Sequence, residues 1–258
     1  MIELDGRPAE AEDLAGLALT NYGHFTTMSM TGGRVRGLPA HLRRLAADCE
    51  RLFDVDLDLD RVRTLIRRAH ADTAQMVRVT VYAPDLDLAR PGADQDPHVL
   101  VTTRPAPAHR PPPLRLRSVA HRRDAPRTKH VGLFETIRQR RLVQREGFDD
   151  ALFVDERSGV LEGASWNIGF HDGAGLVWPA GDQLPGVTME LVKALGVAVS
   201  SEADVDLAKA TGFPVAFVTN AAVGVRAIAS LDGTCYDTAA PVLEELSARY
   251  GALRGDEV

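Results

Sequence analysis

Lysine is scarce in this chain, and its scarcity draws attention to the few positions where it occurs. The 258 residues include 30 basic side chains, of which only three are lysine, namely Lys129, Lys193 and Lys209. Arginine can replace lysine in most surface roles, but not where an amine must lose its proton and attack a carbonyl. Each remaining lysine is therefore a candidate nucleophile for amine–carbonyl chemistry.

Lys129 opens an ordered pattern of residues. A predicted helix follows it, then the segment G-F-D-D-A-L at 147–152, then G-V-L-E at 159–162 and finally Asn167. The pattern resembles the core of the class IV aminotransferases. These fold-type IV enzymes include branched-chain aminotransferases, D-amino acid aminotransferases and aminodeoxychorismate lyases. Because the match keeps its order from Lys129 to Asn167, it is more specific than any single lysine or glutamate.

The resemblance implies roles for Lys129 and Glu162. Lys129 is expected to form a Schiff base with pyridoxal 5'-phosphate (PLP) and to move a proton between the substrate carbon and the cofactor carbon. Glu162 is expected to face the pyridine nitrogen, where a carboxylate keeps the nitrogen protonated and the ring an electron sink. Both residues are predicted to be catalytic and to bind the cofactor, and Asn167 is a further expected cofactor-binding residue.

The cofactor phosphate requires its own binding residues. The segment H-L-R-R-L at 41–45 resembles the family's phosphate-binding helix, in which Arg44 lies on the same helix face as His41. The segment L-P-G-V-T at 184–188 resembles a second family element, at a helix start whose amides and dipole attract an anion. The expected phosphate contacts besides Arg44 come from Gly186, Val187, Thr188, Asn220, Ala221 and Ala222.

The sequence defines the reaction less well than the cofactor. The segment F-T-T at 25–27 resembles the lyases, in which the second threonine, here Thr27, is implicated in eliminating pyruvate. The spacing of Lys129, His130 and Glu135 also resembles the lyases. Both the lyases and the D-amino acid aminotransferases, however, carry an Arg-Gly turn where this chain has A-P-D at 83–85. The substrate carboxylate therefore needs another partner, and the candidates are Arg34, Arg36, Arg78 and Arg90.

Three hypotheses follow. The first, favoured by the missing Arg-Gly turn, is an aminotransferase that moves an amino group between an amino acid or amine and a 2-oxo acid. The second is a 4-amino-4-deoxychorismate lyase, which produces 4-aminobenzoate and pyruvate. The third is a catalytically inactive binding module with the same fold, which the presence of both Lys129 and Glu162 disfavours.

Two α/β domains with mixed sheets are predicted to position these residues, with a small domain at 1–104, a proline-rich linker at 105–113 and a larger PLP-binding domain at 114–258. The periodicity predicts a hairpin at 25–38, helices at 39–53, 59–70, 133–145, 188–195 and 239–250, and strands at 2–4, 76–82, 98–103, 114–119, 151–154, 165–170, 175–178, 215–219 and 226–230. The fold-type IV resemblance implies that the cofactor binds at the domain interface.

Composition excludes several classes of protein. A formal net charge of −6 without a basic tract argues against binding to nucleic acid. No apolar run approaches the ~20 residues that span a bilayer, and the N-terminus lacks a signal-peptide pattern. Cys49 and Cys235 are not spaced as a disulfide framework or a metal site, so no metal is expected. We expect a cytoplasmic protein with small-molecule substrates, no membrane partner and, by the family resemblance, a homodimeric assembly.

Overall fold

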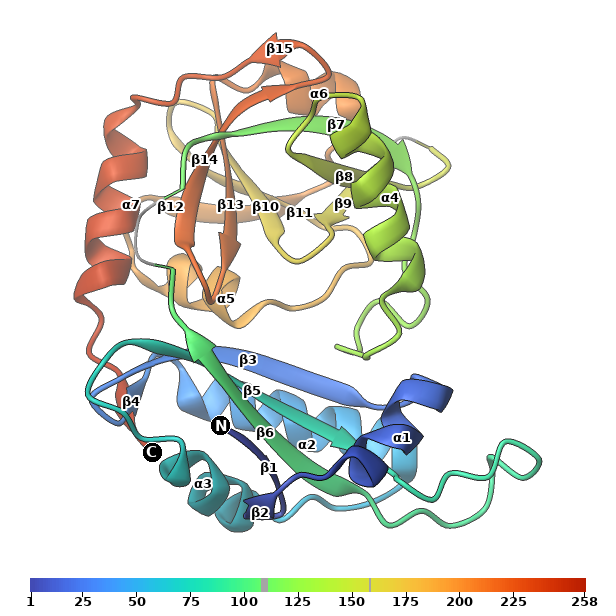
Figure 1. Ribbon diagram of the computed structural model, residues 1–258. Helices are drawn as coiled ribbons and strands as arrows, with labels where there is room; N and C mark the ends of the chain where they lie inside the picture. Colours follow the sequence, from blue (N-terminus) through green and yellow to red (C-terminus); the bar gives the residue numbers. More distant parts are fainter. Residues whose placement is uncertain (108–110, 158) are drawn as a thin grey trace. The chain divides into compact units, whose positions relative to one another are not determined.

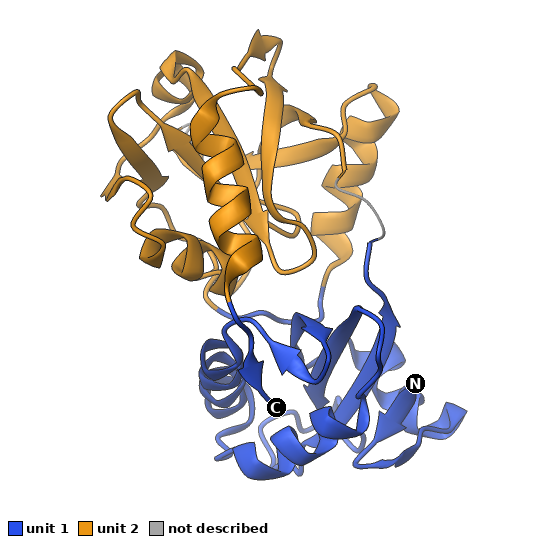
Figure 2. Ribbon diagram, turned by 90° about the vertical axis from the view of Figure 1, so that its left-hand side faces the viewer, with its two compact units in different colours: residues 1–107, 128–132, 254–258 blue, residues 108–127, 133–253 orange. Residues whose placement is uncertain are grey.

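The computed structural model describes residues 1–107, 111–157 and 159–258, which form two compact units (Figure 1 and Figure 2). Unit 1 comprises Met1–Pro107, Thr128–Gly132 and Arg254–Val258, and unit 2 comprises Ala108–Arg127 and Leu133–Leu253. Residues 108–110 of the predicted linker lie outside the described residues. Both units are discontinuous in sequence, whereas the domain division predicted above is continuous, and that division remains a prediction.

Unit 1 is built on a seven-stranded sheet with the order β16-β4-β3-β5-β6-β1-β2, and the pairings found among the described residues are all antiparallel. The strands are β1 (Ile2–Leu4), β2 (Arg7–Pro8), β3 (His24–Thr31), β4 (Arg34–Val35), β5 (Gln75–Tyr82), β6 (His98–Pro105) and β16 (Asp256–Glu257). The turn between β3 and β4 places Gly32 and Gly33 at φ 54° and 70°, as the two central residues of a tight hairpin require.

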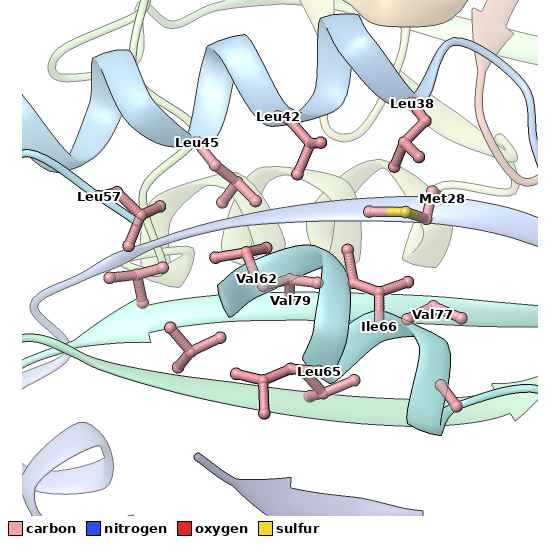
Figure 3. Close-up of a cluster of buried hydrophobic side chains, with 14 of the residues drawn as sticks. Met28, Leu38, Leu42, Leu45, Leu57, Val62, Leu65, Ile66, Val77 and Val79 are labelled. Atoms are coloured by element: carbon pink, nitrogen blue, oxygen red, sulfur yellow. The ribbon is translucent and has the colours of Figure 1, made fainter. Parts of the chain in front are cut away.

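Helices cover the unit 1 sheet on its two faces. Helices α2 (Leu38–Phe53) and α3 (Leu59–Arg68) pack their apolar sides on the face formed by the even-numbered residues of β3 and the odd-numbered residues of β5, as Figure 3 shows for Leu42, Ile66 and Val79. Helix α1 (Ala11–Thr20) packs against Tyr82, which lies on the opposite face. Alternation along the strands places Phe25, Thr27 and Arg78 on this second face as well.

Unit 2 contains a mixed nine-stranded sheet that closes on itself. Its order is β12-β11-β10-β13-β14-β7-β8-β9, with β15 paired to β14, and an additional pairing of β9 with β10 completes a ring of strands. The strands are β7 (Leu114–Ala120), β8 (Asp150–Val154), β9 (Val160–Gly163), β10 (Asn167–His171), β11 (Gly175–Pro179), β12 (Val199–Ala203), β13 (Val215–Asn220), β14 (Gly224–Leu231) and β15 (Thr234–Cys235).

Four helices accompany the unit 2 sheet: α4 (Phe134–Arg145), α5 (Val187–Ala194), α6 (Leu207–Gly212) and α7 (Pro241–Ala252). Helices α5 and α7 enclose a core around Trp178 and Phe217, while Val143 of α4 packs on Phe153 of β8. A separate core around Ile168 joins inward-facing side chains of several ring strands. Among the described residues, the helices are all too short or too polar to span a membrane.

Candidate functional site

The backbone of Lys129 is incorporated into unit 1. Its carbonyl oxygen accepts a hydrogen bond from the amide of Phe25 at 2.9 Å, and the amide of Val131 donates to the carbonyl of Gly23 at 2.9 Å. The backbones of His130 and His24 form an isolated antiparallel β-bridge. The segment 128–132 thus runs along the edge of β3, and these bonds explain why it belongs to unit 1 although it follows the predicted linker.

The side chain of Lys129 shares an aromatic neighbour with an arginine. Its Nζ lies 4.9 Å from the centroid of the Phe25 ring, and the guanidinium carbon of Arg78 lies 3.6 Å from the same centroid. The Nε of Arg78 donates to the hydroxyl of Thr80 at 3.1 Å, and burial lowers the pKa of Arg78 from its ordinary value. A half-buried guanidinium of this kind favours an anionic ligand that replaces its lost hydration.

Geometry separates Arg78 from the other arginines proposed for the substrate carboxylate. Arg90 is highly exposed and pairs with Asp87 at 3.3 Å. Arg34 lies at the other end of β3, where it approaches Glu257 at 3.8 Å. Arg36, in the turn between β4 and α2, is half-buried. Of these candidates, Arg78 is the one whose guanidinium lies against Phe25, which also contacts the amine of Lys129.

The two threonines of the F-T-T segment point to opposite faces of the sheet. Thr26 is buried on the α2 side, where its Oγ1 accepts from Nη2 of Arg44 at 2.7 Å and lies 2.6 Å from Nδ1 of His41. Burial holds the pKa of His41 well below its usual range, so the ring is neutral and its Nδ1 can accept the threonine proton. These hydrogen bonds link the three groups and restrain the guanidinium of Arg44.

Thr27 lies on the opposite face and is paired across the strands with Arg78. It is half-buried, and its hydroxyl makes no hydrogen bond with the residues described in the structure. The hydroxyl is therefore available to a bound molecule on the face that carries Phe25 and Arg78.

In unit 2, Glu162 is held by a buried ion pair. Its Oε1 accepts from Nε of Arg123 at 2.9 Å, and the two side chains are only 7% and 8% exposed. Nη2 of Arg123 also donates to the carbonyl of Pro126 at 2.7 Å. An arginine in this position fixes the orientation of the carboxylate through a charge-assisted hydrogen bond.

Asn167 fixes the loop that leads into α5. It pairs with Glu162 across β9 and β10, and its amide nitrogen donates to Gln183 at 3.0 Å and to the carbonyl of Leu184 at 2.8 Å. A side chain at Gly186 would place its Cβ 1.9 Å from Oδ1 of Asn167, so only glycine fits there. Helix α5 starts next at Val187 without a side-chain cap, which leaves its first amides suited to an anion.

The turn after β13 follows Thr219, which the strand register places beside Asn167. Thr219 pairs with Asn167, and its buried hydroxyl has no hydrogen-bond partner among the described residues. Oδ1 of Asn220 accepts from the amides of Ala222 and Val223, both at 3.0 Å. The amide of Ala222, one of the predicted phosphate contacts, therefore already has a partner within the turn.

The predicted site residues thus form two sets. Unit 1 contains Lys129, Arg44 and Thr27, and unit 2 contains Glu162, Asn167, Gly186–Thr188 and Asn220–Ala222. The sequence patterns assigned no role to the residues that hold these site residues in place. Those residues are Thr26, His41, Asp48 and Arg123. The one available signal for Arg123 is that it lies shortly before Lys129. Other arginines occur in the same stretch, so the sequence alone does not distinguish Arg123 from them.

Comparisons with known proteins identify the family and the fold of the chain. The family model for amino-transferase class IV matches residues 23–231. The fold is similar to a hypothetical aminotransferase from Mycobacterium tuberculosis, bound to α-ketoglutarate and PMP (21% identity, TM-score 0.81, 98% of each chain covered). A PLP-bound form of a protein so described is also similar (20% identity, TM-score 0.81, 98% of this chain and 97% of that one).

Branched-chain aminotransferases have the same fold. The enzyme from Thermoproteus uzoniensis with norvaline is 19% identical at a TM-score of 0.85, with 97% of this chain and 93% of that one covered. The enzyme from Escherichia coli is 17% identical at 0.86, with 100% and 95% covered. A search of curated proteins found no match. The family match spans most of the sequence and includes Lys129, Glu162 and the start of α5, and the chain belongs to the class IV aminotransferase family.

Proposed function

We propose that the protein is a PLP-dependent aminotransferase that moves an amino group between an amino acid or amine and a 2-oxo acid, with the cofactor carried on Lys129. Family membership supports this type of reaction. The observation that carries the proposal is the pair of cations on Phe25, where the amine of Lys129 and the guanidinium of Arg78 contact one ring. An amine and a carboxylate-binding group on a shared neighbour suit a substrate that carries a carbonyl or amine next to a carboxylate.

The residues present fit the cofactor. A phosphate needs charge-assisted donors, and Arg44 and the uncapped start of α5 supply them. A pyridine nitrogen needs a fixed carboxylate, which Glu162 provides through its ion pair with Arg123. The buried hydroxyl of Thr219, for which the described residues offer no hydrogen-bond partner, is a further donor for a bound group.

Each residue then has a defined task. When bound, PLP supplies the electron sink that makes removal of a proton from the substrate carbon possible. Lys129 takes that proton and returns it from its Nζ, while Arg78 binds the substrate carboxylate and sets the orientation of the reacting carbon. Glu162, held in one orientation by Arg123, would keep a proton on the ring nitrogen of the bound cofactor.

A spectroscopic half-reaction tests the proposal. The purified protein mixed with PLP should absorb visible light as a lysine-bound cofactor, and Lys129→Ala should abolish that band. An amine donor added without any acceptor should bleach the band, and a 2-oxo acid should restore it. Lys193→Ala is the matched control and should behave as wild type. A wild-type protein that stays colourless with PLP, or a band that no amine donor bleaches, would contradict the proposal.

One observation favours the lyase as a second candidate. The Thr27 hydroxyl is half-buried, makes no hydrogen bond with the described residues and lies beside Arg78, where it could act on a leaving group. Incubation with 4-amino-4-deoxychorismate and no acceptor distinguishes the two activities, because only the lyase releases pyruvate. Thr27→Val should abolish that release if the lyase is correct, and Ser29→Ala, farther along the same strand face, should not.

The proposal includes a homodimer. Helix α4 exposes Phe134 and Ile137, with 79% and 57% of each residue accessible in the single chain. Apolar side chains so close together on one helix are suited to a protein contact. Light scattering on a size-exclusion column should give twice the chain mass, and Phe134→Asp with Ile137→Asp should shift the mass toward that of a single chain. A wild-type mass of one chain would contradict it.

A further inference from the structure

We propose that Asp48 is a positioning residue for the reaction, because its buried carboxylate binds the backbone of Lys129 and fixes the lysine relative to Arg44. The inference rests on the proposed function for its catalytic consequence, although the contact itself does not. Asp48 lies outside the motifs by which the family resemblance was identified.

Both backbone polar groups of Lys129 take part in hydrogen bonds. One carboxylate oxygen of Asp48 accepts the amide of Lys129 at 3.1 Å, and the carbonyl of Lys129 accepts the amide of Phe25 at 2.9 Å. The first contact comes from a helix and the second from a strand. The α-carbon of Lys129 is therefore fixed between α2 and β3.

A carboxylate in this place is unfavourable unless it serves several donors. The Asp48 side chain is 1% exposed, and burial raises its pKa, whereas the Lys129 amide, Arg44 and Arg51 act in the opposite direction. The second oxygen accepts from Nη1 of Arg51 at 2.9 Å. A neutral or apolar residue would avoid the desolvation of a charge, so the charged group is explained by the donors that it holds.

The position of Asp48 on α2 couples two functional groups. Arg44 and Asp48 are four residues apart, so they lie on the same face of one helix. Through Asp48, this rigid helix sets the distance between the proposed phosphate ligand and the lysine backbone. Since a misplacement of about 1 Å can lower a rate on the order of 10²-fold, loss of this contact should impair proton transfer more than cofactor binding.

Matched variants test the contact. Asp48→Leu keeps the approximate volume and removes the acceptor, Asp48→Asn keeps an acceptor oxygen without the charge, and Arg51→Ala removes the ion pair while leaving the Lys129 contact. Amide exchange of Lys129 in each full-length protein is measured by NMR, and the half-reaction with an amine donor is followed in a stopped-flow instrument after loading with PLP.

We expect Asp48→Leu to exchange the Lys129 amide at least about tenfold faster and to slow the half-reaction about 10–100-fold, with PLP affinity within about threefold of wild type. Asp48→Asn should restore most of both properties, and Arg51→Ala should match wild type. Unchanged exchange in folded Asp48→Leu, or equal losses in Arg51→Ala, would overturn the inference.

Two further outcomes remain interpretable. If Asp48→Leu does not fold, the wild-type, Asp48→Asn and Arg51→Ala proteins decide the matter, because a Lys129 amide that exchanges as fast as an exposed amide in all three overturns the contact. If the wild type binds no PLP, the proposed function fails, while the exchange rates still support or overturn the role of Asp48 in holding the backbone.

Discussion

Arg78 is a charged residue that the fold of unit 1 keeps half-buried. Its guanidinium stacks on Phe25 and donates to Thr80, which orients it. This orientation is set within unit 1 and requires no other residue to move. The side chain therefore presents a preorganised cation to a carboxylate, which reduces the entropy lost when a substrate binds.

Arg78→Gln should consequently lower kcat/KM about 10–100-fold for substrates that carry a carboxylate, because a charge-assisted hydrogen bond is removed. Simple amines without a carboxylate should be affected by less than about threefold. Arg90→Gln, which removes an exposed arginine paired with Asp87, is the control. Steady-state kinetics with an amino acid and its decarboxylated amine compare the two, and an equal loss for both substrates would argue against the carboxylate role.

Glu162 is the residue that the proposed function assigns to the pyridine nitrogen of the cofactor. Glu162→Gln should keep the cofactor bound, because shape and hydrogen bonding are nearly preserved, but slow turnover on the order of 10²-fold through loss of the negative charge. The exposed Glu156 provides a matched control, since Glu156→Gln changes the net charge equally. Single-turnover rates and the spectrum of the bound cofactor are the measurements. Unimpaired turnover in Glu162→Gln would exclude the proposed role.

At the scale of elements, the start of α5 depends on a single close approach. Gly186→Ala would drive a Cβ into Oδ1 of Asn167, 1.9 Å away in the present geometry, so the loop or the helix must shift. We expect PLP affinity to fall at least about tenfold, because the amides of the first turn are displaced from the phosphate. Gly212→Ala is the control, since nothing lies within 4 Å of its added methyl group. Equilibrium dialysis measures the affinity, and an unaltered Gly186→Ala protein would argue against phosphate binding at α5.

Most elements could be predicted from local pattern, but several elements with few buried apolar residues could not. The helix predicted at 39–53 and the hairpin at 25–38 are confirmed, since periodic apolar residues and a Gly-Gly turn define them. Helix α1 was not predicted, because none of its residues is fully buried and its contrast between faces is weak. Strand β12 was missed for a related reason, as its residues are mostly exposed and it is held by backbone pairing.

The functional residues divide in the same way. Lys129, Glu162 and Arg44 follow from ordered motifs, whereas their holding partners depend on which segments meet in three dimensions. The motif residue Asp150 illustrates the limit of pattern, because it is buried and accepts a hydrogen bond from Trp166 at 2.9 Å. Its place in the motif therefore reflects the packing of unit 2.

For the whole molecule, buried histidines predict how stability depends on pH. Burial lowers the pKa of His24 to about 3, and neither ring nitrogen has a hydrogen-bond partner among the described residues. Between that value and the ordinary value near 6.5, the unfolded chain binds a proton that the folded chain does not. The free energy of unfolding should therefore fall as the pH drops below about 6.5, by up to about 1.4 kcal/mol per pH unit from His24.

His24→Leu should make this pH dependence shallower and should not reduce stability at pH 7, because it removes unsatisfied buried nitrogens. Burial raises the pKa of Asp48 and of Asp150, so these groups act with the opposite sign, and the variant must be compared with wild type at each pH. Urea unfolding between pH 4.5 and 7.5 provides the comparison, with exposed His70→Leu as the control. If the free energy of unfolding changed with pH equally in wild type and His24→Leu, His24 would not be the source of this pH dependence.

The incorporation of segment 128–132 along β3 also bears on how relatives of this protein could diverge by recombination. The bonds between β3 and this segment join backbone atoms, so a strand of different sequence can accept the same lysine. A genetic crossover between Thr31 and Leu38 would exchange Phe25 and Thr27 while keeping Arg44, Asp48 and Lys129 together, with an equivalent backbone partner for the lysine. Exchange of the N-terminal part of such a gene would alter the substrate that the protein recognises. The lysine and its amine chemistry would come from the rest of the gene.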